Sequence, residues 1–186
     1  MTHYWGDKPN SATVMQHAQP DPIWSQCDIQ FRMVSYSACA VDRAVFDNDS
    51  MCGGAGACGT EFSHSHASTV INAFNACASA QNKPGKPVIV TGSLDNIQCP
   101  GQCLTPTIGI TDSPEWSIVT QEALALSGGG TIAHELGHLL GVDGHSTNQN
   151  DLMYDKHIAG SPHLIGSDQC AKARTQAAIY QSQVIW

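Results

Sequence analysis

The chain has 186 residues, a length that suits a single domain with a sizeable hydrophobic core. Hydrophobic residues make up 41% and charged residues 13% of the sequence, and with 17 glycines they indicate a compact, loop-rich protein. The formal net charge of −8 argues against nucleic acid and against an anionic membrane surface as partners. No apolar run approaches the length of about 18 residues that would span a membrane. We also expect the protein to be a monomer.

Eight cysteines, an even number, indicate up to four disulfides formed in an oxidising compartment. No pair has the CxxC spacing of a zinc-binding motif, which favours disulfides over metal-bound thiolates. The local pairs that we favour are Cys52–Cys58 and Cys99–Cys103; the other four, Cys27, Cys39, Cys77 and Cys170, can pair in several ways. The first twenty residues lack the apolar core of a signal peptide. We therefore expect a secreted protein whose signal and any pro-segment are absent from this sequence.

The N-terminal half is predicted to contain two helices and one strand. Apolar residues within 11–26 favour a helix that is interrupted or ends near Pro20 and Pro22, since proline lacks the N–H that a helix interior needs. Residues 28–36 alternate apolar and polar side chains, which is typical of a half-buried strand. Residues 67–81 carry apolar side chains at helical spacing, which predicts a second helix.

The middle of the chain is predicted to hold loops and short strands. Residues 47–60 are rich in glycine and predict a loop. Residues 88–90 are Val, Ile and Val, which predict a short buried strand. Two more strands are predicted over 107–111 and 116–120. The turn residues 112–114 between them indicate that these strands are neighbours.

The last third is predicted to contain two helices. The first covers 131–140, preceded by three glycines and followed by Gly141. The second covers about 168–182, with Ser167 as its N-cap. No internal repeat or interdomain linker is visible. The order of elements predicts an α+β fold with a cleft, formed by a single domain over 1–186.

The most informative segment is His134-Glu135-Leu136-Gly137-His138, within a predicted helix. Positions i and i+4 lie on one face of a helix, so the imidazoles of His134 and His138 can bind one zinc ion. Glu135 can take a proton from a water whose pKa the zinc lowers, and pass it to the leaving amine of a peptide bond. A pattern this short also occurs by chance, and the alternative is an exposed helix with two solvated histidines.

The residues that follow argue against chance. Gly141 can adopt the left-handed conformation that ends a helix, so the chain can fold back and bring His145 to the metal. Farther on, the segment Asp-Leu-Met-Tyr contains Met153 and Tyr154. A glycine, a later histidine and a methionine turn therefore accompany the two helical histidines.

With these residues the sequence resembles the metzincin metallopeptidases. It is most similar to the matrixin-like pattern, because Tyr154 directly follows Met153. The resemblance is specific over 131–155. It implies a twisted mixed sheet with backing helices in an upper lobe, about 1–141, and a small lower lobe, about 142–186, that ends in a helix. It also implies one catalytic zinc at the floor of a cleft, with Glu135 as the catalytic residue.

One position departs from the family pattern. The family has its third ligand three residues after Gly141, where this chain has Gly144; His145 comes one residue late and Asp143 one residue early. A bulge at Asp143 and Gly144 can still present His145, because glycine accepts unusual backbone angles. The interval from His145 to Met153 also matches the matrixin spacing. We therefore expect His145 to complete the site, with Asp143 or a more distant group as alternatives.

The resemblance implies three further roles. Met153 would form an apolar floor beneath the imidazoles, which is also what an ordinary core methionine does. Tyr154 and Ile158 would line a substrate pocket. The strand predicted over 107–111 would be a sheet edge that pairs with an extended substrate, although a plain edge is an equal alternative. The residues that would make this contact are Ile108, Gly109 and Ile110.

Two other clusters can be read as metal sites. His64 and His66 can bind a second metal, but they lack a clear carboxylate partner. Residues 47–49 can hold calcium, but they lack the spacing of an EF-hand. We therefore expect one zinc ion and regard calcium as unsupported.

The sequence as a whole predicts a secreted zinc-dependent endopeptidase that acts on proteins or peptides. Two alternatives stay open. One is a catalytically silent zinc-binding or adhesive module of the same fold, which would have no use for Glu135 as a base. The other is a zinc amidase that acts on a non-protein substrate. Digestion of casein, compared with turnover of non-peptide amides, separates these functions.

Overall fold

A computed structural model of the chain describes eight stretches: residues 2–6, 21–31, 33–38, 86–91, 109–112, 116–120, 129–156 and 160–182. The helix predicted over 67–81 and the loop predicted over 47–60 lie outside these residues. So do His64, His66 and residues 47–49, which the sequence did not favour as further metal sites. Within the described residues, no helix has the length and apolar character needed to cross a bilayer.

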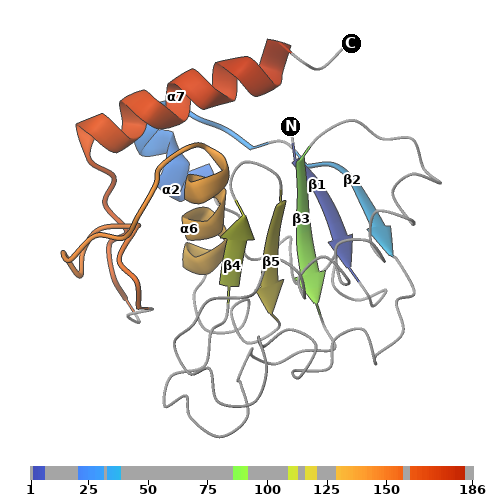
Figure 1. Cartoon of the computed structure of the whole chain (residues 1–186), viewed down its shortest axis with the longest axis horizontal. Coiled ribbons are helices and arrows are strands. Elements are labelled where there is room, and N and C mark those ends of the chain that lie inside the picture. The colour runs from blue at the N-terminus through green and yellow to red at the C-terminus, as the bar shows by residue number, and fades with distance from the viewer. Residues whose placement is uncertain are drawn as a thin grey trace, which may run out of the picture.

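The described strands form one mixed sheet in the order β2-β1-β3-β5-β4. The strands are β1, Thr2–Gly6; β2, Met33–Ala38; β3, Lys86–Thr91; β4, Gly109–Asp112; and β5, Trp116–Thr120. β1 pairs in parallel with β2 and β3, and β3 pairs in parallel with β5. β4 pairs antiparallel with β5, so it lies at one edge of this sheet (Figure 1).

Three of the predicted strands are confirmed. β3 contains residues 88–90, and β5 has the predicted bounds, 116–120. β4 covers the last three residues of the strand predicted over 107–111, and it neighbours β5 as the short turn indicated. β1 was not predicted, because Thr2–Gly6 shows neither strict alternation nor an apolar run.

The strand predicted over 28–36 is wrong at its start, because β2 begins at Met33. Asp28 has a φ of 57°, and its N–H donates to the carbonyl of Ser25 at 3.1 Å, which closes a 3-10 turn. Ile29 is buried in a helical core cluster. Ile29 and Phe31, which suggested alternation, therefore belong to this cluster or pack against it, whereas Met33 is the first residue of β2.

The helices agree with the predictions except at their ends. α6 covers Gly130–Leu139, one residue earlier than predicted. α7 begins at Ser167 and covers Ser167–Ser182, so Ser167 is its first residue and not its N-cap. The N–H of Gly166 instead donates to Oε1 of Gln169 at 2.7 Å, as in the second half of a capping box.

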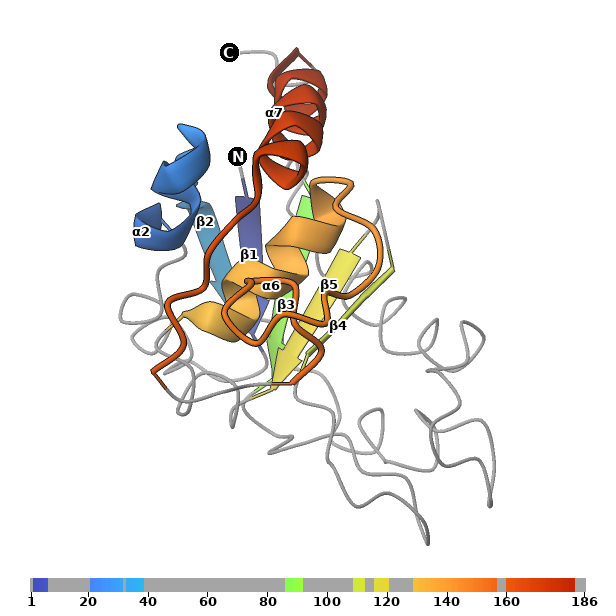
Figure 2. The same cartoon turned by 90° about the vertical axis from the view of Figure 1, so that its left-hand side faces the viewer.

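The helix predicted over 11–26 is described only from residue 21. It consists of α2, Asp21–Trp24, followed by a 3-10 turn over Ser25–Cys27. α6 packs against β4 and β5, and α7 contacts the 3-10 turn. Figure 1 shows α6 beside β4, with α7 across the end of α6, and Figure 2 shows α6 in front of the sheet.

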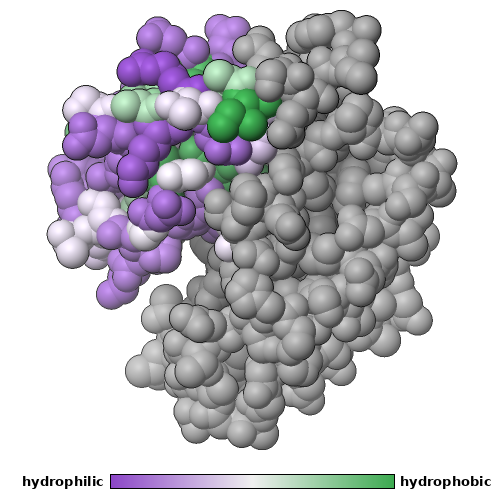
Figure 3. Space-filling model, turned by 45° about the horizontal axis from the view of Figure 1, so that its top comes forward, coloured by the Kyte–Doolittle hydropathy of each residue, from purple (hydrophilic) through white to green (hydrophobic). Residues whose placement is uncertain are grey.

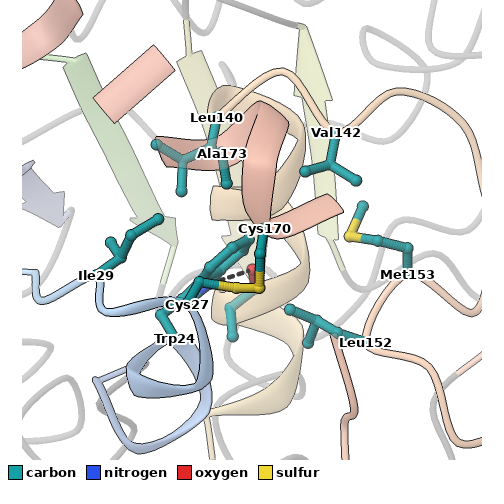
Figure 4. Close-up of a cluster of buried hydrophobic side chains, with 10 residues drawn as sticks. Trp24, Cys27, Ile29, Leu140, Val142, Leu152, Met153, Cys170 and Ala173 are labelled. Atoms are coloured by element: carbon teal, nitrogen blue, oxygen red, sulfur yellow. Dashed lines mark hydrogen bonds between the residues drawn. A yellow bond between two sulfur atoms is a disulfide. The ribbon is translucent and has the colours of Figure 1, made fainter. Parts of the chain in front are cut away.

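A cluster of buried side chains joins α2, α6, the segment after α6, and α7 (Figure 4). Trp24 is fully buried at its centre, and its indole N–H donates to the carbonyl of Ala133 in α6 at 3.0 Å. The hydroxyl of Tyr180 in α7 donates to the carbonyl of Leu139 at 2.7 Å. Side chains of α2 and α7 therefore hold α6 by hydrogen bonds to its backbone carbonyl groups.

A disulfide joins Cys27 to Cys170 across 143 residues of sequence, with their Cα atoms 5.1 Å apart. It links the 3-10 turn to the first turns of α7, and both cysteines are buried. This pair is among the pairings that the sequence left open. The local pairs that we favoured, Cys52–Cys58 and Cys99–Cys103, lie outside the described residues.

The face that carries α7 is mostly hydrophilic over the described residues (Figure 3). Leu164 and Ile179 are the exposed large hydrophobic residues in the described part of the chain, at 50% and 44% exposure. α7 therefore covers the cluster with one side and presents a largely polar surface to solvent.

Replacing Cys27 and Cys170 together by alanine should lower the free energy of unfolding by about 2–5 kcal/mol, because the unfolded chain loses a long-range constraint. Equilibrium unfolding in urea measures the change. As a control, Asp28→Asn removes the charge of a solvent-exposed ion pair with Arg174 and should change stability by less than about 1 kcal/mol. A cysteine double variant as stable as the wild type would show that the bond does not clamp these helices.

Candidate metal centre

Three imidazoles converge beside α6. His134 and His138 lie one turn apart on α6, and His145 comes from the segment that follows the helix. One ring nitrogen from each histidine lies within 4.8 Å of the other two. Nε2 of His134 and Nε2 of His138 are 3.2 Å apart. Within the described residues this is the group of histidine, cysteine and acidic side chains arranged to hold a metal ion.

The hydrogen bonds of the two helical histidines determine which ring nitrogen has a lone pair available for a metal ion. Nδ1 of His134 lies 2.8 Å from the carbonyl oxygen of Leu152, and Nδ1 of His138 lies 3.0 Å from that of Val142. A carbonyl oxygen only accepts, so each Nδ1 must carry the proton, and each neutral ring has its lone pair on Nε2. Two lone pairs at 3.2 Å repel each other unless a cation lies between them. The donors therefore fit a metal ion.

Burial keeps these imidazoles neutral. Burial lowers the pKa of His134 to about 4, against smaller opposing effects that include its bond to Leu152. Burial also lowers the pKa of His138, partly opposed by the charge of Glu135. Both rings are therefore neutral at neutral pH, with Nε2 unprotonated, and can act as ligands without first losing a proton.

The backbone after α6 brings His145 to the other two histidines. Gly141 has a φ of 77°, and the N–H of Val142 donates to the carbonyl of Gly137 at 3.0 Å, which turns the chain back along the helix. Gly144 has a φ of 75°, as expected for a bulge that absorbs the extra residue before His145. Asp143 is exposed and is not a member of the three-histidine group.

Glu135 lies between the histidines and the edge strand. It is 4% exposed, and the hydroxyl of Thr111 in β4 hydrogen-bonds to its Oε2. Burial raises the pKa of the Glu135 carboxyl, while the electrostatic effect of the neighbouring His138 and the bond from Thr111 lower it. A buried carboxyl with a raised pKa takes and releases a proton closer to neutral pH, which suits a general base.

Met153 packs against Gly137 of α6. Its role as an apolar floor beneath the imidazoles stays a prediction. Met153 is 1% exposed, and its N–H donates to Oδ1 of Asp151 at 2.8 Å. The N–H of Tyr154 donates to the carbonyl of Asp151 at 3.2 Å, so residues 151–154 form a tight turn, which we name the Met turn. The N–H of Ser146 donates to the carbonyl of Met153 at 2.7 Å. The Met turn therefore contacts the segment that carries the third histidine.

The predicted substrate residues are only partly described. Gly109 and Ile110 belong to the edge strand β4, whereas Ile108 and Ile158 lie outside the described residues. Tyr154 is half-buried at the end of the Met turn. The structure thus places the edge strand beside α6 and does not test the contacts predicted for substrate.

Sequence reasoning missed two hydroxyl groups near Glu135. Thr111 pairs directly with Ser117 in the register of β4 and β5, and their hydroxyl oxygens are 2.7 Å apart. Ser117 is fully buried, and its hydroxyl donates to the backbone carbonyl of Glu135 at 3.5 Å. A largely buried polar pair bonded to a helix is a signal for function, but it becomes visible only once the register of the strands is known.

A pocket of about 250 Å³ lies beside His145, between the segment after α6 and the first turns of α7. Asp143, Asp168 and Lys172 are among its lining residues. It joins elements that are distant in sequence, so periodicity and spacing did not predict it.

No family model and no curated protein sequence matches this chain. Among solved structures, the crystal structure of archaemetzincin from Methanopyrus kandleri is similar, with a TM-score of 0.57 and 12% sequence identity. The match covers 95% of this chain and 94% of that chain. At this identity the similarity shows the fold, which is metzincin-like, as the motif implied. The narrower resemblance to the matrixins stays a prediction.

Gly137→Ala should destabilise the metal-free protein by about 1–3 kcal/mol, although alanine favours helices, because the new methyl group would overpack a buried site. A Cβ at Gly137 would lie 2.6 Å from Sδ of Met153 and 3.3 Å from Cζ2 of Trp24. Urea unfolding measures the change. In a Met153→Ala background the same substitution should lower the free energy of unfolding much less. An equal loss in both backgrounds would contradict this close approach.

Proposed function

We propose that this chain is a secreted zinc-dependent endopeptidase of metzincin type, nearest to the matrixin-like pattern. In this proposal His134, His138 and His145 are the zinc ligands and Glu135 is the catalytic base. The observation that carries it is the convergence of three imidazoles beside one buried carboxyl group.

The ligand set is the reason for choosing zinc. Three protein nitrogens with room for one further ligand are typical of catalytic zinc, whereas structural zinc sites have four protein ligands. Calcium and magnesium prefer oxygen ligands, which this group does not offer. When bound, zinc supplies Lewis acidity, which polarises a peptide carbonyl and lowers the pKa of water.

Glu135 would carry the proton. Its carboxylate accepts a proton from the attacking water and then delivers it to the leaving amine, so that the base is regenerated in each cycle. Thr111 holds one carboxylate oxygen by its hydrogen bond, which leaves the other oxygen for the water. Burial excludes bulk solvent from this carboxyl group and raises its pKa toward the range in which both transfers are feasible.

The substrate is proposed to be an extended peptide. β4 is a sheet edge beside α6, and the backbone of Gly109 and Ile110 would pair with the peptide as an added strand. Tyr154 and Ile158 are proposed to line the pocket for one substrate side chain. The buried disulfide between Cys27 and Cys170 supports folding in an oxidising compartment, and hence secretion.

Glu135→Ala should abolish peptide hydrolysis but keep zinc bound, because Glu135 is a base and not a ligand. Casein digestion and metal content by mass spectrometry measure the two properties on the same sample. Asp28→Asn, which changes a carboxyl group whose side chain is 91% exposed, should keep full activity. Near-normal casein digestion by Glu135→Ala would refute the mechanism. Turnover of non-peptide amides by a wild type that leaves casein intact would favour the amidase instead.

His145→Ala should lose zinc affinity severely, since catalytic zinc normally has three protein ligands. The matched control is Asp143→Ala, two residues away, which removes the alternative ligand and should bind zinc like the wild type. Competition with a coloured chelator measures both affinities. The reverse result, with zinc lost only from Asp143→Ala, would identify Asp143 as the ligand.

A further inference from the structure

The Met turn presents two consecutive peptide groups to the histidine cluster. The first joins Leu152 to Met153. Its carbonyl oxygen lies 2.8 Å from Nδ1 of His134, and its N–H donates to Oδ1 of Asp151 at 2.8 Å. A peptide group is planar, so whatever fixes the direction of its N–H also fixes the direction of its carbonyl. The carboxylate of Asp151 therefore sets the acceptor that orients the ring of His134.

The second peptide group joins Met153 to Tyr154. Its N–H donates to the backbone carbonyl of Asp151 at 3.2 Å, and its carbonyl accepts the N–H of Ser146 at 2.7 Å. Ser146 directly follows His145, so this bond fixes the backbone beside the third histidine. Two of the three imidazoles thus depend on one four-residue turn.

Asp151 is itself held by α7. The amide Nε2 of Gln169 lies 3.1 Å from Oδ1 and 3.2 Å from Oδ2 of Asp151. The other end of the Gln169 amide accepts the N–H of Gly166, so the side chain is fixed at both ends. The next residue is Cys170, whose disulfide secures this part of α7. The carboxylate therefore has little freedom to rotate away from the Met turn.

We propose that Asp151 is a positioning residue, which orients His134 and His145 for metal binding by holding the Met turn in shape. The proposal rests on the three-histidine zinc site proposed above. Asp151 acts through hydrogen bonds of the turn and not as a ligand, because its carboxylate oxygens are bonded to Met153 and Gln169. Residues that orient metal ligands in this way typically change metal affinity about 10–100-fold when they are replaced.

The test measures the dissociation constant of zinc by chelator competition, for the wild type, Asp151→Ala and Asp151→Asn. Asp151→Ala should bind zinc about 10–100-fold more weakly. Asp151→Asn keeps an oxygen acceptor for the N–H of Met153, so it should recover most of the affinity. Asp155→Asn is the control for charge, because Asp155 is exposed and acts on His134 through its charge, as Asp151 does. It should bind zinc like the wild type.

A second measurement does not depend on zinc. In nitrogen NMR spectra of the metal-free protein, the Nδ1–H of His134 should be protected from exchange in the wild type and in Asp151→Asn, and unprotected in Asp151→Ala. If Asp151→Ala does not fold, Gln169→Glu replaces it. This variant keeps the acceptor for Gly166 but loses the donor to Asp151, so it should weaken zinc binding and His134 protection.

The outcomes separate this inference from the proposed function. Wild-type zinc affinity and a protected His134 in Asp151→Ala would overturn the role of Asp151 and leave the zinc site standing. Equal losses in Asp151→Asn, Asp155→Asn and Asp151→Ala would also overturn it, since charge alone would then explain the effect. A wild type that binds no zinc would overturn the proposed function, and the exchange of the His134 proton would still decide whether Asp151 positions that ring.

Discussion

Two backbone carbonyl groups determine what the helical histidines can do. Leu152 and Val142 accept the Nδ1 protons of His134 and His138, at 2.8 and 3.0 Å, so both lone pairs lie on Nε2. The two Nε2 atoms face each other at 3.2 Å, so their lone pairs repel unless a cation lies between them. The same chain reversal that brings Val142 back to α6 also leads to the third histidine. The path of the chain after the helix therefore both orients the ring of His138 and brings His145 to the cluster.

The rest of the fold keeps α6 and this path in place. The sheet supports α6 and supplies the hydroxyl of Thr111 to the carboxyl group of Glu135. Trp24 and Tyr180 donate hydrogen bonds to carbonyl groups of α6, and the disulfide, which Figure 4 shows, joins the two segments that carry them. A site whose ligands must lie within a few tenths of an ångström of their working positions needs this kind of support.

What the sequence could predict was local. The helix over 131–140, the chain reversal at Gly141 and the bulge at Gly144 depend on helical periodicity and on the backbone freedom of glycine, which neighbouring residues encode. The start of β2 was predicted wrongly, because alternation at Ile29 reflects helix packing and cannot be told from a strand without the tertiary fold. Contacts between residues that are distant in the sequence could not be predicted for the same reason. They include Trp24 with Ala133, Cys27 with Cys170, Thr111 with Glu135, and Asp151 with Gln169.

The most direct test of this account is the metal content of the purified wild-type protein, measured by mass spectrometry alongside casein digestion with and without a chelator. The account predicts about one zinc ion per chain and cleavage that stops when the chelator removes it, since three imidazole nitrogens and one base form a single site. A protein that holds no zinc after exposure to it would contradict the account. The resemblance to metzincins would then describe the fold and not an activity.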